Sequence, residues 1–401
     1  MKCDWKTSTI NDICSLITDG AHNSPRSVAE GMYMASVKDF TEYGLDFSSC
    51  RMISEDDYEK LRLQGCVPEV NDILVGKDGA RFFEDIVIYR QSEKPALLSS
   101  IAILRVDESK AIPEFLYYTF KNPVVQKDVR DNYGSGSAIP RIVLKDFKRM
   151  PVSSPSIDEQ RKLVSILVSL DEKIQNNQRI NENLAQQAQA VFLHLFGNND
   201  SLTPATIADV TLNVTDGVHN TVHDDPEGEY LLLSCKNIKG GSLTVGSSER
   251  KISLETFEKL RRRTKLAKGD VLISSVGTVG ELLLLNTEPA NYEFQRSVAM
   301  VKPNPAVVSP AYLYESLVSQ KAELINAAHG AVQQCLFISD IAGFPIGVPT
   351  TEDLRKFDET VVPMLDAITA NEAESLRLAA LRDTLLPRLM SGELDVSELD
   401  L

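Results

Sequence analysis

The sequence predicts a mixed α/β protein in which two similar globular domains are combined with two long helices. Three observations predict this fold class. Long stretches of the sequence recur about 195 residues apart, as in a tandem duplication. Each copy contains short β-rich runs bounded by Gly, Asn and Asp turn residues. Each copy also ends in apolar residues with the heptad spacing of long, paired helices.

The duplication rests on matches that occur in the same order in both copies. The offset between matching residues stays between 195 and 199, which independent sequences do not produce. The clearest matches are Thr18-Asp19-Gly20-Ala21-His22-Asn23 with Thr215-Asp216-Gly217-Val218-His219-Asn220, Asp72-Ile73-Leu74-Val75 with Asp270-Val271-Leu272-Ile273, and Pro113-x-x-Leu116-Tyr117 with Pro310-x-x-Leu313-Tyr314.

Each copy is expected to follow the same order of elements. A short helix leads into the repeated Thr-Asp-Gly-x-His-Asn loop, and short β-rich runs follow it, such as Asp72–Gly76 and Gly269–Ser275. A helix that starts with proline comes next, at Pro113–Asn122 and Pro310–Ser319. A Gly/Ser-rich loop then connects to the long helix that ends each copy.

The first long helix is the stronger of the two predictions, at about 40 residues. Its apolar positions alternate at spacings of four and three, which indicates a coiled-coil-like stripe. Asn177 and Asn181 are polar positions within it, of the kind that fix the register of paired helices. Gly197-Asn198-Asn199 should end the helix. The stripe consists of Leu163, Leu167, Leu170, Ile174, Asn177, Asn181, Leu184, Ala188, Val191 and Leu195.

The second long helix has a looser stripe. Glu372, Ser375 and Arg382 interrupt its apolar positions, and Pro363 is expected either to start the helix or to kink it. Pro387 is a possible kink near its end. The two stripes most simply pack against each other as an antiparallel pair; the alternative is that each helix packs on its own globule.

The predicted organisation is a first globule at 1–155, a central helix at 156–199, a second globule at 200–350 and a C-terminal helix and tail at 351–401. The net charge of −15 divides among these parts as −3, −1, −4 and −7. Both globules are therefore close to neutral. Because DNA affinity depends on local cationic patches, the acidic total does not exclude a DNA-binding protein.

Several other classes are disfavoured. No apolar run is long enough to span a bilayer, and the first residues lack a secretory stretch. The six cysteines are scattered without metal-ligand spacing, so we expect reduced thiols, a cytoplasmic protein and no zinc. Asn122-Pro123-Val124-Val125 lacks the second proline and the aromatic of an adenine methyltransferase loop, and Gly76-Lys77 lacks P-loop spacing. The chain is therefore expected not to be an enzyme.

At two places the sequence resembles the DNA-specificity subunit of type I restriction-modification systems. Residues 155–174 are similar to the central spacer pattern P-x-x-x-E-Q-x-x-L-V-x-x-L-x-x-L-D-x-x-I of that family, and residues 381–394 are similar to its C-terminal end. The tandem layout agrees over nearly the whole chain. One departure is that Asp353-Leu354 stands in the second copy where the first has Glu159-Gln160, so the two helix starts are expected to differ.

The resemblance implies two target-recognition domains separated by an antiparallel helical pair, each reading one half of a bipartite, asymmetric DNA target. It implies that the helices space the domains and dock two modification (methyltransferase) subunits, with or without restriction subunits. S-adenosylmethionine, ATP and Mg would belong to those partners, and this chain would bind no cofactor. A complex that only methylates DNA and one that also cleaves it in phage defence both remain open.

A protein-binding coiled-coil scaffold is the rival interpretation from a different class. It explains the heptad stripes, but it leaves the basic and Gly/Ser-rich loops of both copies without a role.

The candidate DNA-contacting residues fall into five sets, because phosphates attract cations whereas base edges need donors and acceptors. The alternatives are a solvated charged face, ordinary connecting loops and, for the repeated loop, a structural turn. The basic run of the second copy gives Lys259, Arg261, Arg262, Arg263, Lys265 and Lys268, and the first copy gives Lys77, Arg81, Arg141, Lys145, Lys148 and Arg149. The Gly/Ser-rich loops give Ser135, Ser137, Gln333 and Gln334, and the repeated loop gives His22, Asn23, His219 and Asn220. Position alone adds Lys236, Ser274 and Ser275.

Overall fold

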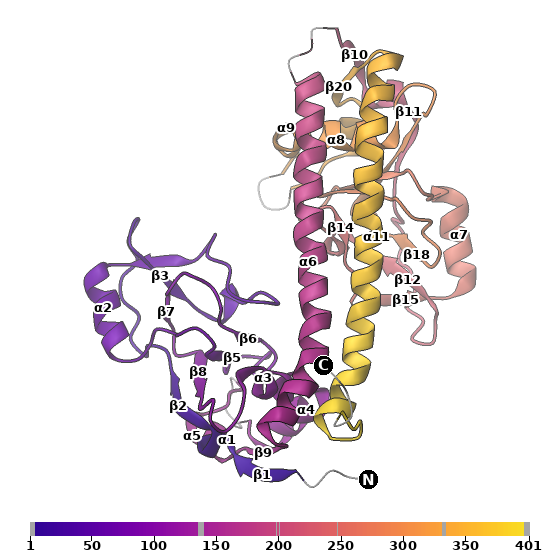
Figure 1. Cartoon of the computed structure of the whole chain (residues 1–401). Coiled ribbons are helices and arrows are strands. Elements are labelled where there is room, and N and C mark those ends of the chain that lie inside the picture. The colour runs from indigo at the N-terminus through magenta and orange to yellow at the C-terminus, as the bar shows by residue number, and fades with distance from the viewer. Residues whose placement is uncertain are drawn as a thin grey trace. The chain divides into compact units, whose positions relative to one another are not determined.

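The computed structural model describes residues 5–134, 140–197, 199, 201–246, 248–330 and 334–396. The chain divides into two compact units. The first unit comprises Met1–Ile174 together with Leu376–Leu401, and the second comprises Gln175–Ser375. Both long helices, α6 (Ile157–Phe196) and α11 (Thr351–Met390), therefore contribute to both units (Figure 1).

The described residues of the first unit form three antiparallel or mixed sheets. A four-stranded antiparallel sheet has the order β2-β8-β5-β6, a three-stranded sheet has the order β4-β3-β7, and β1 pairs with β9. The strands are β1 (Lys6–Thr9), β2 (Cys14–Asp19), β3 (Met32–Ala35), β4 (Arg51–Ile53), β5 (Ile73–Gly76), β6 (Ile86–Ile88), β7 (Ala96–Leu97), β8 (Ile101–Val106) and β9 (Pro151–Ser154).

Helices cover the sheets of the first unit. They are α1 (Ile10–Ile13), the 3₁₀ helix η1 (Val37–Asp39), α2 (Glu55–Leu63), α3 (Pro113–Lys121), α4 (Pro123–Asn132), α5 (Leu144–Arg149) and the adjoining parts of α6 and α11. The strand period of two divides the central strands between two cores. Ile73, Val75 and Leu104 face a core shared with α3 and the long helices, whereas Leu74 and Ile103 face the three-stranded sheet.

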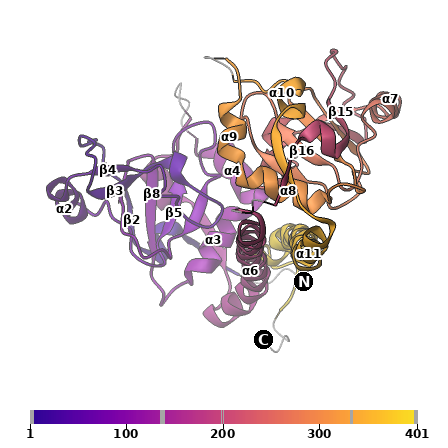
Figure 2. The ribbon, with the colours of Figure 1, turned by 90° about the horizontal axis from the view of Figure 1, so that it is seen from above.

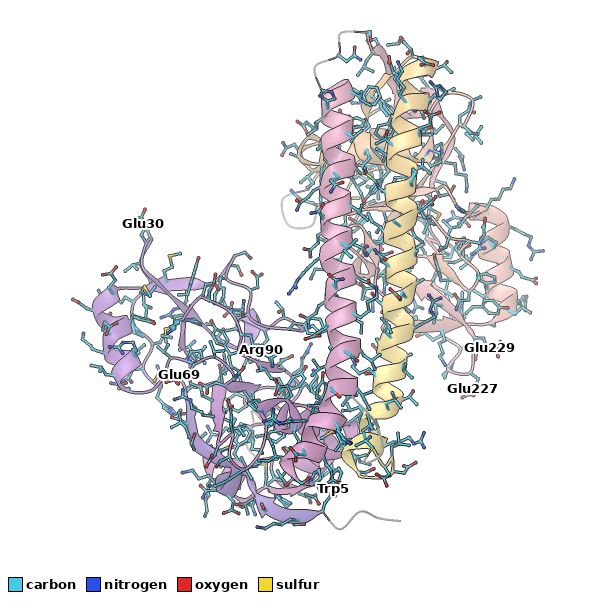
Figure 3. The ribbon with its side chains drawn as sticks, viewed as in Figure 1. Trp5, Glu30, Glu69, Arg90, Glu227 and Glu229 are labelled. Atoms are coloured by element: carbon cyan, nitrogen blue, oxygen red, sulfur yellow. The ribbon has the colours of Figure 1, made fainter. Side chains whose placement is uncertain are left out.

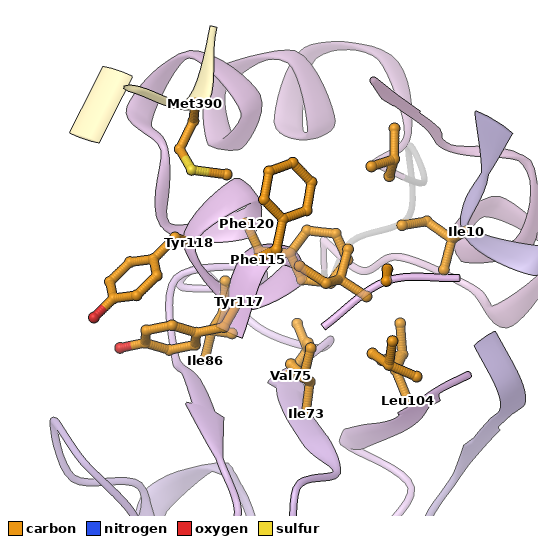
Figure 4. Close-up of a cluster of buried hydrophobic side chains, with 14 of the residues drawn as sticks. Ile10, Ile73, Val75, Ile86, Leu104, Phe115, Tyr117, Tyr118, Phe120 and Met390 are labelled. Carbon is orange, nitrogen blue, oxygen red and sulfur yellow. The ribbon is translucent and has the colours of Figure 1, made fainter. Parts of the chain in front are cut away.

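The end of the chain belongs to the core of the first unit. Leu386, Leu389 and Met390 of α11 are buried in the same cluster as Ile73 and Phe115. Figure 4 shows Met390 beside Phe115 and Phe120 of α3. Trp5, which is labelled in Figure 3, packs edge-on against Phe115, with ring centroids 6.1 Å apart. Segments more than 260 residues apart in sequence thus build one core.

The second unit repeats this architecture, which confirms the predicted tandem fold. Its sheets have the orders β11-β19-β16-β17, β15-β12-β18 and β10-β20, each the counterpart of a first-unit sheet. A two-stranded hairpin, β13-β14, is additional. The strands are β10 (Thr203–Thr206), β11 (Thr211–Asp216), β12 (Tyr230–Leu233), β13 (Ile238–Lys239), β14 (Ser242–Leu243), β15 (Arg250–Ile252), β16 (Val271–Ser274), β17 (Leu282–Leu284), β18 (Tyr292–Phe294), β19 (Val298–Pro303) and β20 (Pro345–Val348).

The helices of the second unit are also counterparts of those in the first. They are the 3₁₀ helices η2 (Ile207–Val210) and η3 (Cys235–Asn237), with α7 (Leu254–Thr264), α8 (Pro310–Ser319), α9 (Lys321–Asn326) and α10 (Ile338–Ala342). A matched ion pair joins the same strands in both copies. Asp72 is 2.8 Å from Arg105, and Asp270 contacts Lys302 at 2.5 Å.

The long helices pair in antiparallel fashion in each unit. In the second unit, the later part of α6 lies beside the earlier part of α11 (Figure 2). The amide of Asn177 donates to Glu374 Oε2 at 2.7 Å, and Asn371 donates to Asn181 Oδ1 at 2.8 Å. The predicted polar positions of the stripe therefore bond across the pair, as expected of residues that fix register.

In the first unit, a buried polar cluster joins the other parts of the same helices. Asp171 of α6 accepts hydrogen bonds from the hydroxyl of Tyr118 at 2.6 Å and from Arg382 of α11 at 2.7 Å. Gln160, which is fully buried, accepts from the amide of Ile112 at 3.0 Å and donates to the Pro155 carbonyl at 3.1 Å. Leu354 replaces it in the second copy and packs against the apolar core.

The structure changes three details of the sequence prediction. Helix α11 begins at Thr351, which excludes one of the two alternatives for Pro363, namely that it starts the helix. The Thr-Asp pair of the repeated loop ends the strands β2 and β11, and these strands separate the loop from the preceding short helices. The connection before each long helix holds a short helix and a strand, α5 with β9 and α10 with β20, in addition to the expected loop. These elements are too short to give a clear periodic pattern.

Candidate nucleic-acid interface

The repeated Thr-Asp-Gly-x-His-Asn loop is held by backbone hydrogen bonds in both units. In the first unit, the amide of Gly20 donates to the Ile101 carbonyl at 3.1 Å and that of Ala21 donates to Leu97 at 2.7 Å. In the second, the amides of Gly217 and Val218 bond to the matching strands. In each unit, these backbone hydrogen bonds therefore fix the position of the loop relative to its sheet.

The glycine of this loop is required by close packing. A Cβ atom on Gly20 would lie 2.2 Å from the carbonyl oxygen of Leu97, and one on Gly217 would lie 2.1 Å from that of Phe294. No side chain fits at those distances. The structure thus explains why the Asp-Gly pair recurs in the sequence.

The histidine and asparagine of the loop are exposed. His22 Nε2 lies 3.3 Å from Asp19 Oδ1, and His219 Nε2 lies 2.5 Å from Asp216 Oδ2. The aspartates are largely covered, whereas the histidine side chains are 75% and 56% exposed. Asn23 and Asn220 are exposed as well. Each loop offers an imidazole and an amide to a ligand, backed by a carboxylate.

The predicted cations of the first unit differ in exposure. Lys77 is buried, and its Nζ lies 3.2 Å from Asp19 and 3.8 Å from Asp78. Arg81 is exposed but contacts Asp85 at 2.6 Å. Arg141 and Lys145 are exposed. The structure therefore places Lys77 beneath the repeated loop, where it neutralises Asp19.

Arg141 lies near the repeated loop of the first unit. The amide of Ile142 donates to the Lys77 carbonyl at 3.0 Å, and the amide of Gly79 donates to Pro140 at 2.9 Å. The segment that carries Arg141 is thus fixed to the end of β5. Ser135 and Ser137, in the same connection, lie outside the described residues.

Two of the three consecutive arginines of α7 have structural contacts. Arg261 forms an ion pair with the buried Glu293 and donates to the Tyr292 carbonyl at 2.9 Å. Burial raises the pKa of Glu293, and the ion pair with Arg261 opposes this rise. Arg263 donates to the carbonyls of Asp216, at 2.7 Å, and Gly217.

All cations of the α7 region other than Arg261 have exposed side chains. Arg263 is among them, although its guanidinium also supports the repeated loop. Lys265 adopts a left-handed conformation (φ 48°) at the C-cap of the helix. The exposed cations are Lys259, Arg262, Arg263, Lys265 and Lys268.

Ser274 and Ser275 lie inside the second unit. Ser274 is fully buried, and its hydroxyl accepts from the amide of Glu281 at 2.7 Å. The hydroxyl of Ser275 donates to the Arg296 carbonyl at 3.3 Å. Both hydroxyls bond to the backbone of neighbouring loops, so they position those loops.

Several loops of the second unit meet at the end of β16. Cys335 forms a bridge with Val276, and the amide of Leu336 donates to the Ser275 carbonyl at 2.8 Å. This contact brings Gln334, which is exposed, to the same end of the sheet as Ser275. Gln333 lies outside the described residues.

Arg296 is a candidate that the sequence interpretation missed. Its side chain is exposed, and its amide donates to the Val218 carbonyl at 3.1 Å, so it stands directly beside the His219 loop. The first copy has Ser99 at the matching position. Since the residue is not repeated, the internal duplication gave no signal for it.

Lys38 is a second missed candidate, for which the sequence did hold a signal. Ser36-Val37-Lys38 and Ser234-Cys235-Lys236 are 198 residues apart and form the equivalent 3₁₀ helices η1 and η3. Lys38 is exposed, whereas Lys236 lies 3.0 Å from Glu249. A comparison of the two copies residue by residue would have paired these lysines.

Acidic turns limit where a phosphate backbone could lie. Glu30 and Glu227 precede matching glycines, Gly31 and Gly228, and both glutamates are exposed. Figure 3 shows Glu30 at the tip of a loop in the first unit, and Glu227 and Glu229 in the turn before β12. These tips should repel phosphates.

The described part of the chain contains no cluster of three or more His, Cys, Asp or Glu residues that could hold a metal ion. Among the described helices, none is both long and apolar enough to span a membrane.

Comparisons with known proteins point in one direction. The family model "Type I restriction modification DNA specificity domain" matches residues 2–186. The chain is 27% identical over 325 residues to the type I restriction enzyme MjaIX specificity subunit of Methanocaldococcus jannaschii, which covers 73% of this chain and 72% of that protein. It is 22% identical over 360 residues to the type I restriction enzyme EcoBI specificity subunit of Escherichia coli, covering 80% and 73%.

The fold agrees with these sequence relatives. A crystal structure of the S subunit of a type I restriction-modification system from M. genitalium aligns with a TM-score of 0.57 at 16% identity, over 96% of each chain. At this identity the likeness shows that the two chains share a fold.

Proposed function

Because the chain belongs to the family of type I restriction-modification DNA specificity subunits, we propose that each of its two globular domains reads one half of a bipartite, asymmetric DNA target. The family supplies DNA sequence recognition and is not catalytic. The domains would comprise residues 1–155 and 200–350, with the helical segments 156–199 and 351–401 as spacers. Since the exposed loops differ between the copies, the two half-sites should differ in sequence.

One observation carries the proposal for the interface. In each unit, the exposed histidine and asparagine of the repeated loop stand at the end of the four-stranded sheet, beside a second loop with an exposed arginine, Arg141 or Arg296. Asparagine pairs with adenine and arginine with guanine in the major groove. These loops would therefore contact base edges.

Exposed cations around the loops would contact phosphates. In the first unit we assign this role to Lys38, Arg81 and Lys145, and in the second to Lys236, Lys259, Arg262, Lys265 and Lys268. Arg263 would add charge while it supports the repeated loop. Lys77, Arg261, Ser274 and Ser275 would act from below by positioning these loops, since each bonds to carboxylates or backbone of the same unit.

The partners we propose are two modification subunits, docked on the helical segments, and restriction subunits where the system cleaves DNA. S-adenosylmethionine, ATP and Mg would be bound by those partners. The chain would contribute the choice of sequence, and its helices would set the distance between half-sites, in units of about 34–36 Å per DNA turn.

The proposal is tested by methylome sequencing of cells that carry the complete system, with and without this gene. We expect one bipartite adenine-methylation motif to disappear with the gene. Replacing residues 1–155 with the first domain of another specificity subunit should change one half of the motif and leave the other half unchanged. A change in both halves, or in neither, contradicts independent reading by the two domains.

Binding to duplex DNA in vitro separates this function from a protein-binding scaffold. The logarithm of the affinity should fall linearly with the logarithm of the salt concentration, because bound counterions are released. Arg262→Ala should reduce the slope by about 1. Arg355→Ala is the matched control, since Arg355 is an exposed arginine of the same unit that is paired with Glu352 and Glu359. Affinity that does not depend on salt would favour the scaffold.

A further inference from the structure

A cavity borders the repeated loop of the first unit. It has a volume of about 230 Å³, several times the roughly 30 Å³ that one water molecule occupies in the liquid. The loop forms one wall, and residues just after α2 form the other. The lining residues are Thr18, Asp19, Gly20, Ala21, His22, Asn23, Gln64 and Cys66.

An arginine side chain reaches the matching loop of the second unit. Gln64 and Arg263 both stand ten residues after the serine that caps their helix, Ser54 for α2 and Ser253 for α7. Arg263 Nη2 donates to the carbonyls of Asp216, at 2.7 Å, and Gly217. The corresponding residues of the first unit, Asp19 and Gly20, line the cavity.

The two copies therefore differ in how these carbonyl groups are satisfied. Among the described residues, and apart from the ladder of β2, no backbone amide donates to the Gly20 or Asp19 carbonyl. The side chain that donates to the Asp19 carbonyl is the hydroxyl of Thr18, at 3.5 Å. The Asp19 carboxylate is already engaged by Lys77 and His22. The residues that line the cavity thus include Asp19 and Gly20, whose counterparts in the second copy accept from Arg263, and Gln64, which stands where the second copy has that arginine.

We propose that this cavity is a guanidinium-binding site that takes an arginine side chain from another polypeptide. A guanidinium has five N–H donors and no acceptor, which suits a wall of carbonyl oxygens. Such a wall disfavours phosphate, which can only accept. The bound arginine would support the loop with His22 and Asn23, as Arg263 supports the loop with His219 and Asn220. The second domain supplies its own arginine, and the first receives one.

The test is thermal unfolding of the full chain in the presence of a small arginine analogue. N-acetyl-L-arginine amide, added at a millimolar concentration several times its Kd, should raise the Tm for unfolding of the first unit by about 2–4 °C. N-acetyl-L-citrulline amide, which has nearly the same shape but no charge, should not. An equal response to both compounds, or to neither, overturns the proposal.

Two reciprocal variants locate the response. Gln64→Arg should fill the cavity from within, raise the Tm without ligand and remove the response to the arginine analogue. Arg263→Gln should lower the Tm and create a second responsive site, so that the analogue restores part of the lost Tm. A response that persists in Gln64→Arg, or an Arg263→Gln chain that the analogue does not rescue, contradicts the assignment.

A base amino group of DNA is the rival occupant. In that case a DNA duplex, and not the arginine analogue, would raise the Tm of the unaltered chain, and Gln64→Arg would reduce the effect of the duplex. This result also overturns the proposal. Neither Tm measurement, with the arginine analogue or with the duplex, depends on which DNA sequence the chain recognises. Failure of this proposal can therefore be distinguished from failure of the proposed function.

Discussion

At the scale of single residues, the proposed interface combines exposed groups with buried ones that hold them. His22 and Asn23 are exposed, while Asp19 and Lys77 beneath them are largely covered and paired. The exposed polar groups and the covered charges beneath them therefore have different roles, even where they are neighbours in sequence. Substitution should separate these roles by whether it changes DNA affinity or stability.

Arg296 should be a base-reading residue of the second domain. Its side chain is exposed and adjoins Val218 of the repeated loop. Arg296→Ala should weaken binding of the cognate duplex by about 5- to 150-fold, since an arginine–guanine pair contributes about 1–3 kcal/mol. Fluorescence anisotropy on the motif found by methylome sequencing measures this change. Arg355→Ala should leave the affinity nearly unaltered, and equal losses in both variants would indicate a general charge effect.

Glu315 should make the second unit less stable as the pH rises. It is 2% exposed, and burial raises its pKa from 4.5 to about 7. Because the folded state favours the protonated form, its stabilising effect is complete below pH 4.5 and is lost as the pH rises to about 7. Glu315→Gln should remove about 3 kcal/mol of this dependence, at about 1.4 kcal/mol for each pKa unit.

Urea denaturation at pH 5 and pH 8 measures the effect of Glu315. The unaltered chain should lose more stability than the variant between these two values. A variant with the same pH dependence as the unaltered chain would show that the carboxyl group is already ionised in the folded state.

At the scale of elements, α11 forms polar contacts with α6 and with β14 where apolar residues would have continued the stripe. Glu372 bonds to Ser242, Ser375 accepts from Asn177 at 3.3 Å, and Arg382 bonds to Asp171. These three residues are the ones that interrupt the heptad spacing. Each interruption therefore has a polar partner in its own unit.

Arg382→Met should destabilise the first unit by about 3–5 kcal/mol, because it leaves the buried Asp171 without its cationic partner. Chemical denaturation followed by circular dichroism measures the loss. Replacing both residues, as Asp171→Asn with Arg382→Met, should recover most of it, since no unpaired charge then remains. If the double variant is no more stable than the single one, the packing of Arg382 rather than its charge is what matters.

The sequence predicted elements well wherever a pattern was long or repeated. Helix α6 spans 40 residues and ends before Gly197 as expected, and α8 starts and stops at the predicted Pro310 and Ser319. The partners of Glu372 and Arg382 could not be predicted, because they lie 130 and 211 residues away in sequence. A heptad pattern shows which positions of a helix are apolar, but it does not show which distant residue will bond to the polar positions that interrupt the pattern.

The candidate site was predictable only in part, and for a related reason. The repeated loop was visible because it occurs twice, and the structure places its histidines at the surface. The basic run of α7 was equally visible, yet Arg261 and Arg263 bond to groups of their own unit. Composition identifies a cation, but whether it meets a carboxylate or the solvent depends on the fold.

At the scale of the whole molecule, residues near the end of the chain pack in the same core as residues near its beginning. Leu386, Leu389 and Met390 near the C-terminus complete the core that Ile10 and Ile73 begin. A substitution near residue 390 should therefore unfold structure that is formed by the first 174 residues. Sequence proximity would suggest the opposite, namely an effect confined to the second copy.

Leu389→Ala should destabilise the first unit by about 2–5 kcal/mol, as expected for a truncated core leucine. Hydrogen exchange should become faster in β5 and β8, with β16 unaffected. Leu381→Ala is the control on the same helix, because Leu381 is 47% exposed. Faster exchange in β16 as well would mean that the two units unfold together.

The way in which the repeated loops are anchored has an evolutionary consequence. Backbone amides bond both loops to the sheet, and a glycine in each loop packs against it. The exposed side chains of Asn23 and Asn220 take no part in these backbone bonds, so they can mutate while the loop keeps its backbone position. If each domain reads one half of the target, as proposed, a lineage that carries this fold would acquire new target preferences one half at a time.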